Sequence, residues 1–180
     1  MLVLLACNKS NLVENNRTLN IDSVNLQTQG GITYFNGNAF SGKVFQLLEN
    51  GKDTLSIQEF KNGKEDGTWK QFYSTNKIKE LRYFKAGLKE GKYTSWWENG
   101  KLKAIYLFKN GEYEGSFKEW LPNGKLYKEM HYHKGYEEGS QKVWYDSGKI
   151  KSNYQMVNGR RFGLLGTKNC VNVSDSLFKK

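Results

Sequence analysis

Two histidines and one nearby glutamate are the residues of this chain whose types and spacing come closest to a metal site. His131 and His133 are separated by one residue, so on a β-strand both would project from the same face as Glu129. The alternative is that they are exposed strand residues, because the corresponding positions elsewhere in the chain hold tyrosine, leucine and lysine, and no other segment supplies a further ligand. We therefore expect no metal site and no cofactor.

Paired carboxylates are the other group that could do chemistry. Two acids can act as general acid and base in hydrolysis, and the chain has three such sets: Glu65-Asp66, Glu112 with Glu114, and Glu137-Glu138. The simpler interpretation is that they are loop charges that balance lysines along one edge of a sheet. A nucleophile would need a histidine or another base within reach, and the Gly-Lys pairs lack the spacing of a phosphate-binding loop. We expect no catalytic residues.

Regularly spaced glycines define the elements that must position these side chains. One series repeats every 24 residues, preceded by Gly42 at an interval of 25: Gly67, Gly91, Gly115, Gly139 and Gly163. A second series lies nine residues into each unit, with Asn76 in the place of one glycine: Gly51, Gly100, Gly124 and Gly148. Glycine and asparagine tolerate positive φ, so these positions are turns. Self-similarity at a fixed period of this length is typical of repeat proteins.

Each unit contains two short segments, rich in aromatic and aliphatic residues, that are bounded by Asn-Gly turns. This pattern predicts two strands joined by tight hairpins. In the second strand the apolar residues recur at even spacing, so one face packs and the other is wet. The fold expected is all-β, an elongated single-layer antiparallel β-meander of 24-residue hairpin repeats. Equivalent rings would form two ladders along it: Phe72, Trp96, Trp120 and Trp144 in one, and Phe84, Phe108 and Tyr132 in the other.

The repeated unit resembles the MORN-repeat variant found in bacterial proteins. It reads Gly-x-Trp/Tyr/Phe-x-x-Trp/Phe-Tyr/Trp-x-x-Asn-Gly-Lys-Leu/Ile-Lys, then a second strand and Tyr/Phe-x-x-Gly, over five units in residues 42–163. The resemblance implies a single-layer meander without catalytic residues of its own. Members of that family are often antitoxins of toxin–antitoxin pairs, membrane-associated proteins or lipoproteins. The first unit departs from the pattern, as a capping repeat does.

The start of the chain resembles a lipoprotein signal. Leu4-Leu5-Ala6-Cys7 matches the lipobox, in which the cysteine carries the lipid, and an ordinary apolar N-terminus is the alternative. We assign residues 1–7 to a residual signal and lipobox, 8–31 to a flexible polar tether, 32–166 to the repeat domain and 167–180 to a C-terminal tail. A capping strand is expected within the last repeat residues, at 162–165. Cys170 is interpreted as a structural or free thiol.

The aromatic residues are either the core itself or a surface for ligands. The first interpretation follows because a single sheet has little else to pack. However, Trp96 and Trp97 are adjacent, so one indole must lie on the less buried face of a strand. Tyr73 and Tyr145 share the position of Trp97 in their units, which predicts an exposed row. The candidate ligand-contact residues are Tyr73, Trp96, Trp97, Trp120, Trp144 and Tyr145.

These observations predict a non-enzymatic binding or scaffolding lipoprotein at the bacterial cell envelope. Its 28 Lys and Arg residues outnumber the 18 Asp and Glu residues, which favours anionic partners. The expected partners are the membrane, through a lipid on Cys7, and a protein, an anionic lipid or a glycan. Nucleic acid is not expected because of the export signal. The alternative is a cytoplasmic, antitoxin-like protein that binds a protein toxin, and the oligomeric state stays open.

Overall fold

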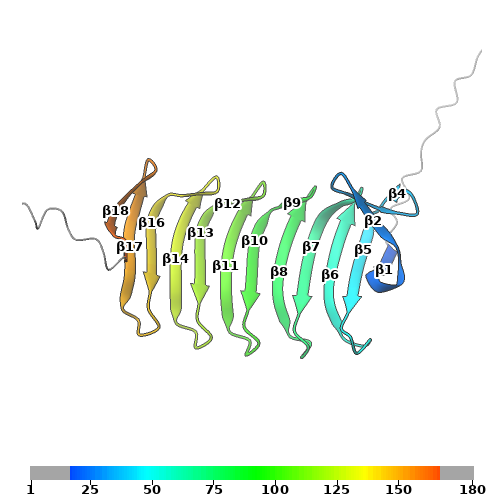
Figure 1. Cartoon of the computed structure of the whole chain (residues 1–180), viewed down its shortest axis with the longest axis horizontal. Coiled ribbons are helices and arrows are strands. Elements are labelled where there is room, and N and C mark those ends of the chain that lie inside the picture. Colours follow the sequence, from blue (N-terminus) through cyan, green and yellow to red (C-terminus); the bar gives the residue numbers. More distant parts are fainter. Residues whose placement is uncertain (1–16, 167–180) are drawn as a thin grey trace, which may run out of the picture.

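The computed structural model describes residues 17–166, and it shows a long sheet, one layer thick, built from antiparallel hairpins (Figure 1). This sheet has 15 strands, and a separate three-stranded sheet lies near its N-terminal end. No α-helix is present between residues 17 and 166. The predicted all-β meander of hairpin repeats is confirmed.

The strands of the large sheet follow one another in sequence order after the first pair. The elements before the regular repeats are β1 (Arg17–Asn20), the 3-10 helix η1 (Ile21–Ser23), β2 (Leu26–Gln29), β3 (Ile32–Phe35), β4 (Asn38–Ala39), β5 (Gly42–Leu47) and β6 (Thr54–Lys61). The repeats continue with β7 (Lys64–Phe72), β8 (Ile78–Lys85), β9 (Leu88–Lys89), β10 (Gly91–Trp96), β11 (Leu102–Lys109), β12 (Glu112–Tyr113), β13 (Gly115–Trp120) and β14 (Leu126–His133). The last elements are β15 (Tyr136–Glu137), β16 (Gly139–Trp144), β17 (Ile150–Val157) and β18 (Arg160–Leu164).

The N-terminal boundary of the folded part differs from the sequence prediction. The tether expected at residues 8–31 is wrong for residues 17–31, which form β1, η1 and β2. β1 pairs in parallel with β5 and places Leu19 opposite Val44, which is 3% exposed. The four residues of β1 pair with the backbone of β5, which would otherwise be an open edge of the sheet. An unpaired edge strand can associate with other chains, so this pairing protects the N-terminal end of the sheet. The lipobox with Cys7, the rest of the tether and the tail at 167–180 lie outside the described residues.

Two-residue turns with positive φ close the hairpins at one long edge of the ribbon. Both residues of the Asn62–Gly63 turn have positive φ, as type I′ turns require, and Asn76 at φ 57° takes the place of glycine at the opposite edge as expected. Ala86 and Lys134 adopt φ of 50° and 48° in the same kind of turn, where neither residue type is favoured. Turn identity therefore comes from the surrounding repeat as well as from the local residues.

Within each hairpin the unit-opening glycine faces a large side chain. Gly67 lies opposite Phe84, and Gly91 lies opposite Phe108. The register then shifts by a β-bulge just before the last strand residue, as between Ser95 and Trp96. Such a bulge increases the local twist and re-aims the side chains at that point. The position that holds Phe72, Trp96, Trp120 and Trp144 is therefore irregular in every repeat.

The aromatic ladders are arranged differently from the prediction. Equivalent positions lie two strands apart, roughly 10 Å at the usual strand spacing, and no ring contact joins Phe72, Trp96, Trp120 and Trp144 in the described chain. Stacking instead runs across adjacent strands, with ring centroids 4.9 Å apart for Tyr93 and Tyr106 and 4.0 Å apart for Tyr106 and Phe117. The cross-strand neighbour, and not the equivalent residue of the next repeat, is the packing partner.

The C-terminal end of the ribbon is a regular hairpin without a bulge. β17 and β18 keep one register from Val157–Arg160 to Asn153–Leu164, whereas the internal junctions shift, as between the pairs Tyr132–Glu137 and Lys128–Val143. The strand expected near residues 162–165 is confirmed as β18. A Cβ on Gly163 would lie 2.6 Å from the Asn153 carbonyl oxygen, so this terminal strand depends on glycine at that position.

Gly63 joins the small sheet to the large one, and its replacement tests this junction. Its N–H donates to the Phe40 carbonyl at 2.7 Å, and its carbonyl accepts from the Thr33 N–H at 2.8 Å. Left-handed strain in Gly63→Ala costs ~1–2 kcal/mol. A Cβ would also lie 2.8 Å from the Thr33 carbonyl oxygen, which adds ~1–3 kcal/mol of overpacking. We expect urea denaturation to show the summed loss in the free energy of unfolding.

Gly100→Ala is the matched control for that substitution. Gly100 has φ of 82°, and no atom lies within 4 Å of the position of its Cβ, so this variant carries the strain without the clash. Equal losses of unfolding free energy in the two variants would contradict a tight junction at Gly63.

Candidate ligand-binding face

One face of the sheet carries a continuous row of cross-strand pairs at the middle of the hairpins. The pairs are Trp69–Arg82, Tyr93–Tyr106, Phe117–Met130 and Gln141–Tyr154. We call this surface the aromatic face. Phe117 and Met130 are each 8% exposed, so much of the face is core, in agreement with the interpretation that the rings pack against one another.

Arg82 interrupts the rings of the aromatic face. Its guanidinium lies 4.3 Å from the Trp69 ring centroid and 5.5 Å from that of Tyr93, within the range of cation–π attraction. The guanidinium also pairs with the Glu80 carboxylate at 2.5 Å, and the Tyr93 hydroxyl donates to the other oxygen of Glu80 at 2.8 Å. Arg82 is therefore positioned by a carboxylate and two rings.

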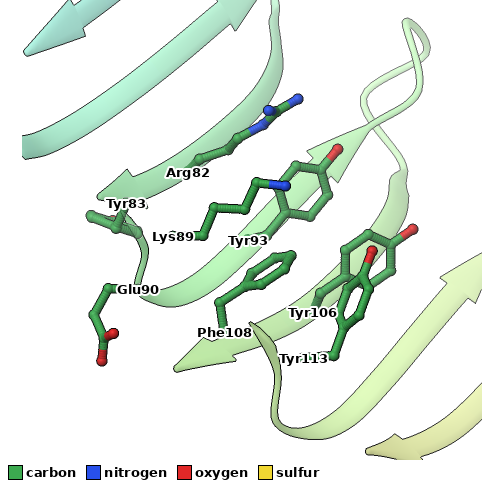
Figure 2. Close-up of a pocket in the computed structure, with 8 residues that line it drawn as sticks. All are labelled: Arg82, Tyr83, Lys89, Glu90, Tyr93, Tyr106, Phe108 and Tyr113. Carbon is green, nitrogen blue, oxygen red and sulfur yellow. The ribbon is translucent and has the colours of Figure 1, made fainter. Parts of the chain in front are cut away.

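A shallow pocket of about 150 Å³ opens beside Arg82 (Figure 2). Its lining combines two cations, one carboxylate and five aromatic rings: Arg82, Tyr83, Lys89, Glu90, Tyr93, Tyr106, Phe108 and Tyr113. The Lys89 ammonium lies 5.2 Å from the Phe108 ring centroid, and no carboxylate of residues 17–166 lies within ion-pair distance of it. A cation beside rings, open to solvent on one side, suits an anionic group on a partly apolar ligand.

The burial of this face shifts the pKa of the groups along it. Burial raises the pKa of Tyr93 to about 12, and it raises the pKa of Tyr106, which donates to Glu119 at 2.6 Å. Burial also raises the pKa of Glu65, against the opposing effect of the Arg82 and Lys89 charges. The groups along this face are thus partly removed from water, which raises the pKa of each of them.

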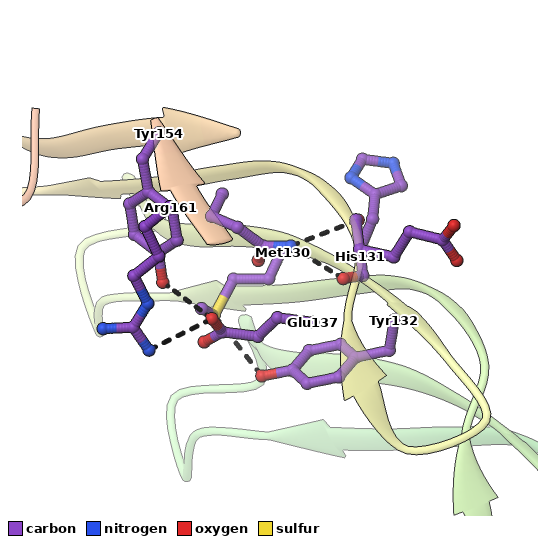
Figure 3. A network of polar contacts seen from close by, with 8 residues as sticks. Met130, His131, Tyr132, Glu137, Tyr154 and Arg161 are labelled. Atoms are coloured by element: carbon purple, nitrogen blue, oxygen red, sulfur yellow. Dashed lines mark hydrogen bonds and ion pairs between the residues drawn. The ribbon is translucent and has the colours of Figure 1, made fainter. Parts of the chain in front are cut away.

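The C-terminal part of the same face is closed by polar contacts (Figure 3). Gln141, with 0% exposure, donates through Nε2 to the His131 carbonyl at 2.8 Å and to the Glu138 carbonyl at 3.2 Å. Glu137 accepts from the Tyr154 hydroxyl at 3.1 Å and pairs with Arg161 at 3.3 Å. Glu137 is thus paired with Arg161 and Tyr154, whereas Lys89 in the pocket has no carboxylate partner among the described residues.

The exposed row predicted at Tyr73, Trp97 and Tyr145 is wrong for Tyr73 and Trp97, and only Tyr145 is exposed. The Tyr73 hydroxyl donates to the Trp96 carbonyl at 2.9 Å, and the Trp97 indole donates to the Trp120 carbonyl at 3.0 Å. Both are half-buried, because each reaches across to the next repeat. Tyr145 is 47% exposed. Trp97 lies just after the bulge and outside the strand, so strict alternation with its neighbour does not apply to it.

The remaining candidate aromatics are half-buried: Trp96, Trp120 and Trp144. Each ends its strand at the bulge, away from the pocket lining. Ligand contact by any of the six candidate aromatics stays a prediction.

The structure does not gather the two histidines and Glu129 around a common point. The His131 ring nitrogen Nδ1 lies 3.2 Å from the Ser140 carbonyl, and His133 Nδ1 lies 3.1 Å from a Glu114 carboxylate oxygen. Glu129 pairs with Lys118 at 2.8 Å. Residues 17–166 contain no group of three potential metal ligands.

The acidic residues before the unit glycines have a structural role that the sequence reasoning missed. Asp66 accepts from the Ala86 N–H at 3.0 Å, Glu90 from the Asn110 N–H at 2.9 Å, and Glu114 from the Lys134 N–H at 3.0 Å. Each carboxylate thus caps the left-handed residue of the next turn. The signal was their fixed position one residue before the glycine.

The pocket residues were also missed, although the sequence held a signal for them. Arg82 stands where other units have Tyr106, Met130 and Tyr154. Lys89 stands where they have Glu65, Tyr113 and Glu137. Both are departures from the repeat at positions that face the same side of the sheet, so comparing equivalent positions would have identified them.

The fold and these contacts define a single-layer β-repeat protein whose units are joined through side chains. The model of the family described as MORN repeat variant matches four tandem segments, residues 65–86, 89–110, 113–134 and 137–158. The chain therefore carries four tandem MORN-variant repeats. A search of curated proteins finds no match to this chain. No helix between residues 17 and 166 is long and apolar enough to span a membrane.

The raised tyrosine pKa values predict a loss of stability at high pH. Burial raises the pKa of both Tyr93 and Tyr132 to about 12, above the value of about 10 for tyrosine in an unfolded chain. The folded state therefore retains protons that the unfolded chain releases, so this stabilisation is complete below about pH 10 and is lost as the pH rises through about 12. Chemical denaturation at a series of pH values should show a shallower decline for Tyr93→Phe, and identical slopes would contradict the assignment.

Proposed function

We propose that this protein is a non-enzymatic binding module that holds an anionic, carbohydrate-bearing partner of the cell envelope against its sheet. MORN-variant repeats of this kind suggest a binding or scaffolding role. The observation that carries the proposal is the pocket at Lys89, where an ammonium group without an ion pair among residues 17–166 stands beside aromatic rings.

The pocket suits this role because it is a local exception in a regular scaffold. In neighbouring repeats the place of Lys89 is taken by Tyr113, which packs on Phe108 and Phe117, and by Glu137, which is paired with Arg161. The side chains of Tyr113 and Glu137 therefore contact other residues of the same sheet. Sugars present both apolar C–H faces and polar groups, so an acidic sugar can contact the rings while its carboxylate approaches Lys89.

The second part of the proposal is a lipid anchor at Cys7, which would place the repeats at the cell envelope. Its support is the order Leu4-Leu5-Ala6-Cys7 in the sequence. The antitoxin-like alternative would instead require a toxic partner gene next to this one, and no contact in the described chain favours it.

Metabolic labelling tests the anchor directly. In bacterial cells that express the gene with its native upstream sequence, an alkyne fatty acid should label the wild type and Cys170→Ser but not Cys7→Ser. The two variants each lose one thiol, so they are matched. Absence of label from the wild type, or equal label in all three proteins, would refute lipid attachment at Cys7.

Binding of a carboxylated oligosaccharide tests the pocket. We expect oligogalacturonate to bind the wild type, and Lys89→Gln to weaken that binding roughly tenfold because it removes one charge-assisted contact. Lys109→Gln is the matched control, since Lys109 is exposed and lies outside the pocket lining. Titration calorimetry measures both. Equal affinities of the two variants would remove the pocket from the proposal.

A further inference from the structure

The turns that join β7 to β8, β10 to β11, β13 to β14, and β16 to β17 lie along one long edge of the ribbon (Figure 1). Lysines accumulate in and just after these turns. We call these turns, together with the first two residues of the strands that follow them, the lysine edge (residues 73–79, 97–103, 121–127 and 145–151). They contain seven lysines: Lys77, Lys79, Lys101, Lys103, Lys125, Lys149 and Lys151. Equivalent turns are two strands apart, so the charges recur about every 10 Å.

The lysine edge has a large excess of positive charge that the other edge lacks. Its seven lysines face two acids, Glu98 and Asp146. The corresponding turns of the opposite edge, residues 61–67, 85–91, 109–115 and 133–139, hold six lysines and seven acids. No lysine of the lysine edge forms an ion pair within residues 17–166, whereas carboxylates of the opposite edge cap its turns.

Three of the seven lysine side chains, Lys77, Lys101 and Lys125, donate to backbone carbonyls of the next repeat. Lys101 Nζ donates to the Asn123 carbonyl at 2.9 Å, and Lys77 Nζ donates to the Glu98 carbonyl at 3.1 Å. An ammonium group has three donors, so others stay available to a ligand. Because these side chains are held before binding, less conformational entropy is lost when a ligand binds them.

Aromatic rings accompany the lysines along the same edge. Lys103 Nζ lies 4.6 Å from the Trp97 ring centroid, and Lys151 Nζ lies 5.8 Å from that of Tyr145. Rings beside cations add an apolar surface to the row of charges. A polymer that presents both C–H faces and carboxylates matches this combination better than a simple polyanion does.

We propose that the lysine edge binds an acidic polysaccharide that runs lengthwise along the ribbon. A sugar residue is about half as long as the spacing of roughly 10 Å between equivalent turns, so alternate sugars would meet equivalent lysines. This inference rests on the proposed binding function but concerns a different surface from the Lys89 pocket. Nucleic acid and an anionic membrane surface could also bind a row of lysines, so the test must distinguish them from the polysaccharide.

The test compares two triple variants of the full chain that lose the same charge. The edge variant is Lys79→Gln, Lys103→Gln and Lys151→Gln. The control variant is Lys61→Gln, Lys85→Gln and Lys109→Gln, which are exposed lysines of the opposite edge. The probe is hyaluronate, which carries a carboxylate on alternate sugars, with neutral dextran, single-stranded DNA and phosphatidylglycerol vesicles as comparisons. Urea denaturation confirms that both variants fold.

We expect hyaluronate to bind the wild type and the control variant with affinities within twofold, and the edge variant at least tenfold more weakly. Binding should also change the fluorescence of tryptophan, because Trp97 lies beneath Lys103. Equal losses in both triple variants would mean that net charge alone binds the polymer and would overturn the inference. Tighter binding to DNA or to the vesicles than to hyaluronate would overturn it as well.

Including Lys89→Gln in the same assay separates the two proposals. Loss of hyaluronate binding in Lys89→Gln, with the edge variant unaffected, would overturn the lysine edge and support the pocket. No binding of hyaluronate to the wild type, together with no binding of oligogalacturonate, would overturn both.

Discussion

Hydrogen bonds from side chains of one repeat to the backbone of the next are the interaction on which this structure depends. Adjacent hairpins share few ladder pairs, such as Thr94–Leu81 and Ser95–Glu80 between β10 and β8. A sheet without a second layer cannot compensate by burying a thick core. The Tyr73 hydroxyl, the Trp97 indole and the carboxylates before the unit glycines therefore add to the backbone hydrogen bonds that keep the hairpins in one sheet. Conserving the period of 24 residues conserves all of these contacts together.

The sequence was sufficient for the fold because its strongest signals are local. Asn-Gly pairs determine two-residue turns, and alternation of apolar residues determines the packed face, so strands and hairpins followed directly. The sequence was insufficient where the backbone conformation of a residue depends on the neighbouring strand or repeat. The bulge before Trp96 and the left-handed backbone of Lys134 are imposed by cross-strand register and by capping from the preceding repeat. Residues 17–20 were misassigned because their pairing partner, β5, lies well after them in the chain, whereas residues 26–29 pair with the adjacent β3.

The candidate site was harder to predict than the fold for a related reason. Aromatic residues attract attention by type, yet most of them pack between strands, and the exposure of Trp97 depends on a bulge that alternation does not reveal. The informative residues were Arg82 and Lys89, which differ from their equivalents in other repeats. In a repeat protein, a residue type that recurs at equivalent positions of the repeats is explained by the fold. A residue that differs from its equivalents requires another explanation. The lysine edge differs from the pocket, because its positive charge is apparent only when the lysines of several repeats are counted together.

The two ends of the ribbon differ from its interior, and this constrains how such a protein changes length. β1 pairs in parallel at one end, and at the other β18 continues its hairpin without the register shift of the internal junctions. Gly163 lies against the Asn153 carbonyl there. Within residues 17–166 neither end of the ribbon has the shifted register of the internal junctions, so a unit added at either end would meet a junction unlike those between the internal hairpins. Duplication or deletion of a whole unit between β8 and β17 meets matching junctions on both sides, and evolution would lengthen or shorten this chain from within.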